Sequence, residues 1–253
     1  MEKKYKLAEE TINVGDKTLY RIEALKDFSD VKKGDKGGYI EKEENLSQNG
    51  NCWVYDDAVV YGTARVYDNA KVYDYAKVYH NAVVYGNAEV FNNAQVFGNA
   101  KVYDYAKVCY YAKVCDNAQV YCNALVIDNA RVYSNAKVYG NAEVYGNAVV
   151  DDNAQVYDNA NVYEDAEVFG NAEIRGDAVI TSKSDYIVFK NWWSSGRYFT
   201  WTRSNNMWKV GCFYGTGEEL IDKAYKDSKL SGREYERVVK YIESILKDNN
   251  TDV

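Results

Sequence analysis

A six-residue unit repeats without insertion from residue 54 to residue 179. These 126 residues form 21 units, with Val in the first position of twenty units, Ile in that of the last, and Ala in the fifth position of all of them. A unit this short cannot bury its own apolar side chains, so such a period is typical of architectures in which successive units stack on one another. The repeat therefore constrains the fold more than any other feature of the chain.

Each unit reads as one short strand and one corner. The fifth position, the sixth position and the first position of the next unit form an Ala-x-Val trio, whose outer side chains point to the same face of a strand. The third and fourth positions are mostly Gly, Asp or Asn, as in Asp68-Asn69 and Gly86-Asn87. These residues tolerate the positive φ of a tight corner. We therefore expect Ala and Val to point inward, with a corner after every strand.

This unit resembles the hexapeptide repeat of left-handed parallel β-helices, in which an aliphatic residue is followed four positions later by a small one. The resemblance implies a mainly β protein, built as a single-stranded left-handed parallel β-helix. Three units would make one 18-residue coil, so the 126 residues of the repeat imply about seven coils.

The flanks of the repeat are expected to cap it, because a bare β-helix exposes strand edges at both ends. Residues 1–53 predict an N-terminal β cap, in which Cys52 occupies an Ala position and starts the core. We expect residues 54–179 to form the β-helix. Residues 180–253 are expected to form a C-terminal cap of aromatic-rich strands and two helices. Capping-box patterns at Thr216–Glu219 and Ser231–Glu234 mark the expected helix starts.

The flanks carry a second resemblance. Residues 20–28, 34–39 and 44–47 resemble the leader of bacterial and phage β-helix proteins that are usually labelled transferases by analogy of fold. Residues 211–216 resemble a module of phage and prophage β-helix proteins. The resemblance implies a phage context, and with it a role as a phage-derived inhibitor of a host defence protein or signal.

Aromatic residues fill 16 of the 21 second positions. Positions 18 apart should stack, and one such column consists of Tyr67, Tyr85, Tyr103, Tyr121, Tyr139 and Tyr157, followed by Arg175. Stacked rings stiffen the helix, and exposed Tyr stripes are also typical of protein interfaces. The two interpretations are compatible, and the column is a candidate partner-binding surface.

The fourth coil departs most from the pattern. Cys109 and Cys115 replace rings in two columns, and Tyr110 and Tyr111, like Tyr105, occupy turn positions that other units give to Asp, Gly or Asn. Such breaks often mark a functional site, so Cys109, Tyr110, Tyr111 and Cys115 are added to the candidate partner-binding residues. Neutral drift in a redundant repeat explains the same breaks.

The tail concentrates aromatic and basic residues. Within seventeen residues it contains Trp192, Trp193, Arg197, Trp201, Arg203 and Trp208. Flat rings stack and Arg pairs with anions, so these six residues are a candidate pocket for a nucleotide, a sugar or a peptide. The alternative is that the rings form the small core of a cap.

The resemblance to β-helix acyltransferases implies acyl transfer from acyl-CoA or an acyl carrier protein, with a His general base between the subunits of a trimer. The one His of this chain, His80, stands in a turn position that other units give to Asp or Gly, and no loop interrupts the 21 units to wall a donor pocket. His80 is therefore the only candidate catalytic residue, and a solvated corner is the alternative. No nucleophile-elbow, P-loop or zinc-protease motif occurs.

The repeat carries 9 basic and 17 acidic residues, a net charge of −8. An acidic prism suggests mimicry of nucleic acid, although Lys residues in the outward strand position dilute its field. The same charge disfavours direct binding of DNA or RNA. The Asp corners recur every six residues, unlike the nine-residue period of calcium-binding β-rolls, so we expect no metal and no cofactor.

Five Cys residues without metal-ligand spacing favour reduced thiols and a cytoplasmic location, which is the host cytoplasm if the chain is phage-encoded. No signal-peptide segment or apolar run of membrane-spanning length occurs, so we expect no membrane partner. The sequence as a whole favours a non-catalytic binding or scaffold protein with a protein partner, assembled as a homodimer or homotrimer. Acyltransferase activity is the alternative, and nucleic-acid mimicry a further one.

Overall fold

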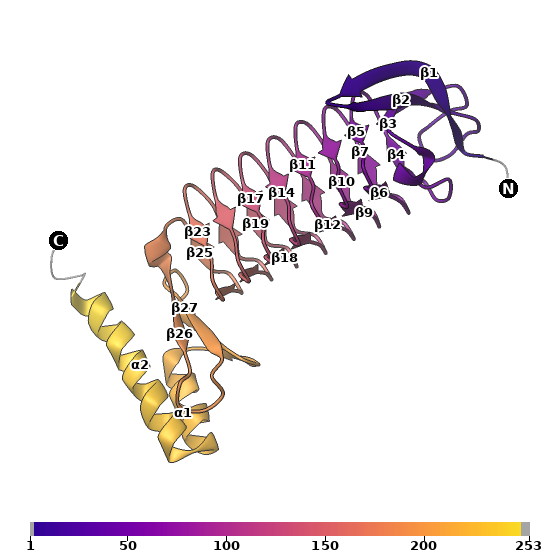
Figure 1. Cartoon of the computed structure of the whole chain (residues 1–253). Coiled ribbons are helices and arrows are strands. Elements are labelled where there is room, and N and C mark those ends of the chain that lie inside the picture. The colour runs from indigo at the N-terminus through magenta and orange to yellow at the C-terminus, as the bar shows by residue number, and fades with distance from the viewer. Residues whose placement is uncertain (1–2, 249–253) are drawn as a thin grey trace.

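The computed structural model describes residues 3–248. It is a parallel β-helix with a hairpin at its N-terminal end and a small antiparallel sheet with two helices at its C-terminal end (Figure 1). Each coil contributes one two-residue strand to each of three parallel sheets, and strands 18 residues apart pair in register, as Val90 pairs with Val72 and Val108. The predicted parallel architecture and coil length are confirmed.

The three sheets run along the axis of the β-helix. One contains β5 (Val59–Val60), β8 (Lys77–Val78), β11 (Gln95–Val96), β14 (Lys113–Val114), β17 (Arg131–Val132), β20 (Val149–Val150) and β23 (Glu167–Val168). The second contains β4 (Trp53–Val54), β7 (Lys71–Val72), β10 (Glu89–Val90), β13 (Lys107–Val108), β16 (Leu125–Val126), β19 (Glu143–Val144), β22 (Asn161–Val162) and β25 (Val179–Ile180). The third contains β6 (Arg65–Val66), β9 (Val83–Val84), β12 (Lys101–Val102), β15 (Gln119–Val120), β18 (Lys137–Val138), β21 (Gln155–Val156) and β24 (Glu173–Ile174).

The repeated Ala and Val side chains form one continuous core along the axis. Every Ala of the fifth position is fully buried, as are the Val and Ile of the first position. The third position has a positive φ, for example 59° at Asp68 and 68° at Gly86. Asp68 also accepts the backbone N–H of Gly86 from the next coil, at 3.2 Å. The corner residues therefore turn the chain and bond successive coils together.

At the N-terminal end, the β-helix begins earlier than the repeat. The strands β1 (Tyr5–Val14) and β2 (Lys17–Ala24) form an antiparallel hairpin that pairs with β3 (Lys36–Ile40). β3 in turn pairs in parallel with β5, and after the short helix η1 (Glu43–Asn45) Leu46 forms a parallel bridge with Val66. β3, Leu46 and β4 thus complete an irregular first coil, and the β-helix has about eight coils, as the eight strands of one sheet show.

At the C-terminal end, the chain leaves the β-helix. After η2 (Lys183–Asp185), the strands β26 (Tyr186–Lys190), β27 (Tyr198–Thr202), β28 (Met207–Val210) and β29 (Phe213–Gly215) form an antiparallel sheet. The helices α1 (Gly217–Asp227) and α2 (Lys229–Asp248) pack on it around Phe199, Trp208 and Leu220. α1 starts at the predicted capping box, whereas α2 begins two residues before the second one. The Ser228 hydroxyl accepts the Ser231 N–H at 3.1 Å, so Ser228 takes the N-cap position in place of Ser231.

Residues 3–248 contain no helix that combines the length and the apolar character needed to cross a membrane.

Candidate functional site

The six tyrosines of the predicted column form a ladder of stacked rings. The ring centroids of Tyr67, Tyr85, Tyr103, Tyr121, Tyr139 and Tyr157 follow one another at 4.7 to 5.0 Å, with interplanar angles of 13° or less. The Arg175 guanidinium continues the column 5.5 Å from the Tyr157 ring centroid. The rings therefore use their faces on one another, which is the structural role expected of the column.

The ladder is half-buried, and three of its six hydroxyls donate to the coil that follows. The Tyr103 and Tyr139 hydroxyls donate to Gln119 and Gln155 of the next coil, at 3.5 and 3.3 Å. Burial raises the pKa of both phenols to about 12, so they are neutral at physiological pH. A partner would reach only the ring edges, and partner binding by this ladder stays a prediction.

The other two columns lose their stacking at Cys109 and Cys115. Tyr73 stacks on Phe91 and Tyr79 on Phe97, at 4.7 and 4.9 Å, and the next second positions are the thiols of Cys109 and Cys115. Cys109 is buried and Cys115 half-buried. Burial raises the pKa of each thiol to about 11, so neither is a thiolate at neutral pH.

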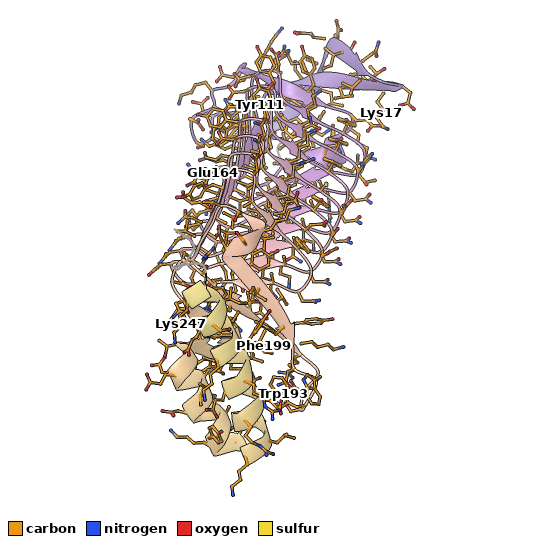
Figure 2. All side chains as sticks on the ribbon, turned by 90° about the vertical axis from the view of Figure 1, so that its left-hand side faces the viewer. Lys17, Tyr111, Glu164, Trp193, Phe199 and Lys247 are labelled. Carbon is orange, nitrogen blue, oxygen red and sulfur yellow. The ribbon has the colours of Figure 1, made fainter. Side chains whose placement is uncertain are left out.

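Four tyrosines stand outside the stacks, in turn positions. Tyr75, Tyr105, Tyr110 and Tyr111 have exposed fractions of 62%, 62%, 51% and 60%. Tyr105 precedes β13 and Tyr110 and Tyr111 follow it, so three of the rings flank one strand at two corners of one coil. Figure 2 shows Tyr111 on the edge of the β-helix, away from Trp193 and Phe199 of the tail.

Tyr75 belongs to the same corner column as Tyr111, two coils earlier, because the two are 36 positions apart. Neither Tyr75 nor Tyr105 was predicted from the sequence as a binding residue. Their turn positions contained the signal, because a side chain there points away from the strands. Tyr111 also lines a depression of 520 Å³ together with Gln95, Lys113, Arg131 and three Asn side chains.

His80 lies on an exposed corner with a φ of 58°. Its ring meets the edge of the Tyr79 ring at 4.9 Å, and its backbone carbonyl accepts the Thr63 N–H at 2.7 Å. Within residues 3–248 its imidazole has no hydrogen-bond partner. A general base is usually oriented by a second group, which for His80 would have to come from a substrate or from another chain.

The six candidate residues of the tail are divided between the core of the cap and the surface. Trp201 and Trp208 are buried in the core of the cap, and the Trp201 indole N–H donates to Asn206 at 2.9 Å. Trp193 packs edge-on against Tyr235 at 4.9 Å, and its buried indole N–H has no acceptor within the described residues. By contrast, Trp192 is 74% exposed.

Arg197 and Arg203 are also exposed, so the six residues do not line one pocket. Arg197 instead lies beside a cleft between the tail and the last coils.

Residues 3–248 contain no cluster of three or more His, Cys, Asp or Glu side chains suited to a metal ion.

Comparison with known proteins gives a partial match. No protein-family model matches the chain. A stretch of 42 residues is 48% identical to the Escherichia coli K12 protein described as "Uncharacterized acetyltransferase YdcK". The matched stretch covers 17% of this chain and 13% of that protein. The match supports a resemblance to β-helix transferases.

Proposed function

We propose that this chain is a non-catalytic binding protein that acts in the cytoplasm and engages a protein partner through Tyr75, Tyr105, Tyr110 and Tyr111. The observation that carries the proposal is the exposure of these four rings, each more than half accessible. None of them takes part in a ring stack within residues 3–248, so they do not contribute to the ladders that stiffen the coils. Burial of exposed Tyr side chains is a common source of binding energy at protein interfaces.

The arrangement of the four rings suits a flat contact. Three of them belong to one coil, and Tyr75 lies about 10 Å away along the axis, at two strand spacings. The coils between them are rigid, so little conformational entropy would be lost on binding. The phage resemblance makes a host protein the proposed partner class, and a second copy of the chain would give the expected homo-oligomer.

Acyl transfer is the second candidate function, and the 42-residue match fits it as well as it fits a binding protein. In that case His80 would act as general base, and a neighbouring copy would supply the group that orients it. Mimicry of nucleic acid remains a further proposal, because the net charge of the repeat is −8.

The first experiment captures partners from a host lysate with the tagged chain and identifies them by mass spectrometry. The double variant Tyr105→Ser/Tyr111→Ser should lose a partner that the wild type retains. The control Tyr241→Ser removes an equally exposed ring from α2 and should keep it. Equal capture by wild type and double variant would contradict the proposed surface.

Two further measurements separate the alternatives. If sedimentation shows an oligomer that the double variant dissociates, the partner is a second copy. A thermal shift with acetyl-CoA that His80→Ala abolishes, together with acyl transfer to an acceptor, would support the transferase instead.

A further inference from the structure

A cleft of 540 Å³ lies between the last coils and the tail. Its coil side consists of Asn153, Gln155, Asn171 and Glu173, and its tail side of Arg197, Tyr198, Lys209, Gly211 and Cys212. The two sides are joined directly. The Glu173 N–H donates to the Thr200 hydroxyl at 2.9 Å, and the Lys209 ammonium pairs with the Glu173 carboxylate at 2.9 Å. The cleft is therefore part of the folded chain and needs no second subunit to form.

The coil side presents unused amide donors. Along this corner the Asn side chains donate from coil to coil, and the last of these bonds runs from Asn135 to Asn153 at 3.3 Å. Within residues 3–248 the Asn153 and Asn171 amide groups donate to no acceptor. Gln155 accepts from Tyr139 through its carbonyl oxygen, and its NH₂ is likewise unused in this part of the chain. The wall thus favours a ligand that brings acceptor atoms.

The tail side is cationic. Arg197 is exposed and has no acidic partner among the described residues. Lys209 is the second cation of the lining, and the Lys190 ammonium lies over the Tyr198 ring, 5.8 Å from its centroid. Among residues 3–248, Glu173 is the one carboxylate that lines the cleft, and it is already paired with Lys209.

An adjacent depression of 200 Å³ shares Arg197 and Tyr198 and contains Asp227 on its wall. The cleft itself is lined by two cations, Arg197 and Lys209, and by one carboxylate, in a chain whose net charge is −7. This local excess of positive charge favours an anionic ligand, and a guanidinium without a partner suits a phosphate in particular.

Tyr198 adds a flat surface beside these charges. Its side chain is 43% exposed, whereas its neighbour Phe199 is buried in the core of the cap. A ring that is anchored in a sheet next to a free Arg can stack on a heterocyclic base through the face that Lys190 does not cover.

We propose that this cleft binds a mononucleotide, with its phosphate on Arg197, its base on the ring of Tyr198, and acceptor atoms of the base or sugar on the Asn171 and Gln155 amides. This inference goes beyond the proposed function, since none of these residues belongs to the corner tyrosines.

Isothermal titration calorimetry on the full chain tests the proposal, with AMP and UMP as probes. At least one of them should bind, and ribose 5-phosphate and adenosine should each bind at least about tenfold more weakly, because each carries half of the recognised chemistry. Arg197→Gln and Tyr198→Leu should each weaken binding about tenfold or more. The matched controls Arg233→Gln and Tyr241→Leu, on α2, should leave it unchanged.

Three results would overturn the proposal. They are no binding of either nucleotide at millimolar concentration, an unchanged affinity in both cleft variants, and ribose 5-phosphate binding as tightly as the nucleotide. The double variant Tyr105→Ser/Tyr111→Ser should retain nucleotide binding, so failure of the cleft and failure of the corner surface are distinguishable.

Discussion

The two ends of the β-helix differ in the kind of backbone group that each would leave unpaired. The backbone hydrogen bonds between coils run in one direction, from an N–H to a carbonyl of the coil ahead, as from the Tyr55 N–H to the Val72 carbonyl. The first coil is therefore left with carbonyls that have no coil before them, and the last coil with N–H groups that have no coil after them. A parallel stack has this polarity by construction, so its two ends require different chemistry.

The N-terminal end supplies donors. The Lys4 ammonium donates to the carbonyls of Cys52 and Gly50 at 2.8 and 3.4 Å, and the Tyr5 hydroxyl donates to that of Leu46 at 2.6 Å. Lys4 is almost completely buried, which is rare for a lysine and reflects this role.

The C-terminal end supplies acceptors. The N–H groups of Glu173, Val179 and Thr181 donate to the side-chain oxygens of Thr200, Ser204 and Asp185, at 2.9, 2.7 and 2.8 Å. The two flanks are therefore not interchangeable. The N-terminal flank supplies donors for unpaired backbone carbonyls, and the C-terminal flank supplies acceptors for unpaired backbone N–H groups.

Breaking the irregular first coil should have the largest effect. Gly38 occupies the position of an inward Ala, and a Cβ there would lie 2.5 Å from the Ala58 carbonyl oxygen and 2.7 Å from Val54. Gly38→Ala should lower the free energy of unfolding by about 3 kcal/mol, because backbone must move to accommodate the methyl group. Chemical denaturation measures the loss.

Gly15→Ala is the control for this prediction. No atom of the described residues lies within 4 Å of the Cβ it would add, and only the positive φ of 62° opposes it. A cost of about 1 kcal/mol is expected there. Equal losses in the two variants would contradict the close packing of the first coil.

Removing the buried donor should have the next largest effect. Lys4→Met keeps most of the side-chain volume and leaves two carbonyls of the first coil without a donor, at a cost of about 2–3 kcal/mol. The exposed Lys6, which pairs with Glu23 at the surface, is the control, and Lys6→Met should change stability by about 0.5 kcal/mol or less.

The pH dependence of the stability of the wild type and of Lys4→Met sharpens this test. Burial lowers the pKa of Lys4 below the 10.5 of a free lysine. As pH rises toward 10.5, the folded chain therefore loses this proton before the unfolded chain does. Wild-type stability should therefore increase relative to Lys4→Met between neutral pH and about 10. A constant difference over that range would show that Lys4 is not desolvated.

The regular coils could be predicted from the sequence because the six-residue period maps directly onto burial, with every Ala and Val of the pattern inside. The first coil escaped prediction because Gly38-x-Ile40 replaces the Ala-x-Val pattern and because eight positions, rather than six, separate Leu46 from Val54. The tail has no repeat. No pattern in its sequence therefore indicates that Trp201 is buried by the antiparallel sheet and Trp192 exposed.

The columns of the candidate site could be predicted from the same period, whereas the exposure of its side chains and the cleft could not. The 18-residue spacing placed Tyr67 and Tyr85 in one column, and the rings do stack. Exposure was harder to predict, because the second position lies along the face of a sheet, whereas the turn position of Tyr105 projects from a corner. The cleft beside Arg197 joins segments that no local pattern relates.

Removing one acceptor at the C-terminal end should cost less than removing the donor of two carbonyls at the other end. Thr200→Val preserves the shape of a buried side chain and leaves the Glu173 N–H without its partner. We expect a loss of about 1–2 kcal/mol in the free energy of unfolding. The exposed Thr11 in β1 is the control, and Thr11→Val should be nearly neutral.

The smallest expected effect compares the two ends of the tyrosine ladder. Burial raises the pKa of both phenols, more at Tyr157, which is 7% exposed and donates to Glu173, than at the half-buried Tyr67. A phenol whose folded pKa exceeds its unfolded value of about 10 contributes stability that is complete below pH 10 and is lost as pH rises toward the folded value.

Tyr157→Phe should therefore make the melting temperature fall less steeply between about pH 9 and pH 11 than in the wild type, by about 1 °C. Tyr67→Phe should reduce the slope by a smaller amount, because its ring retains more contact with water. The measurement is a series of thermal melts of the three proteins across this range. If the two variants changed the slope equally, Tyr157 would be no better shielded from water than Tyr67, and the asymmetry of the two ends would be confined to their backbone groups.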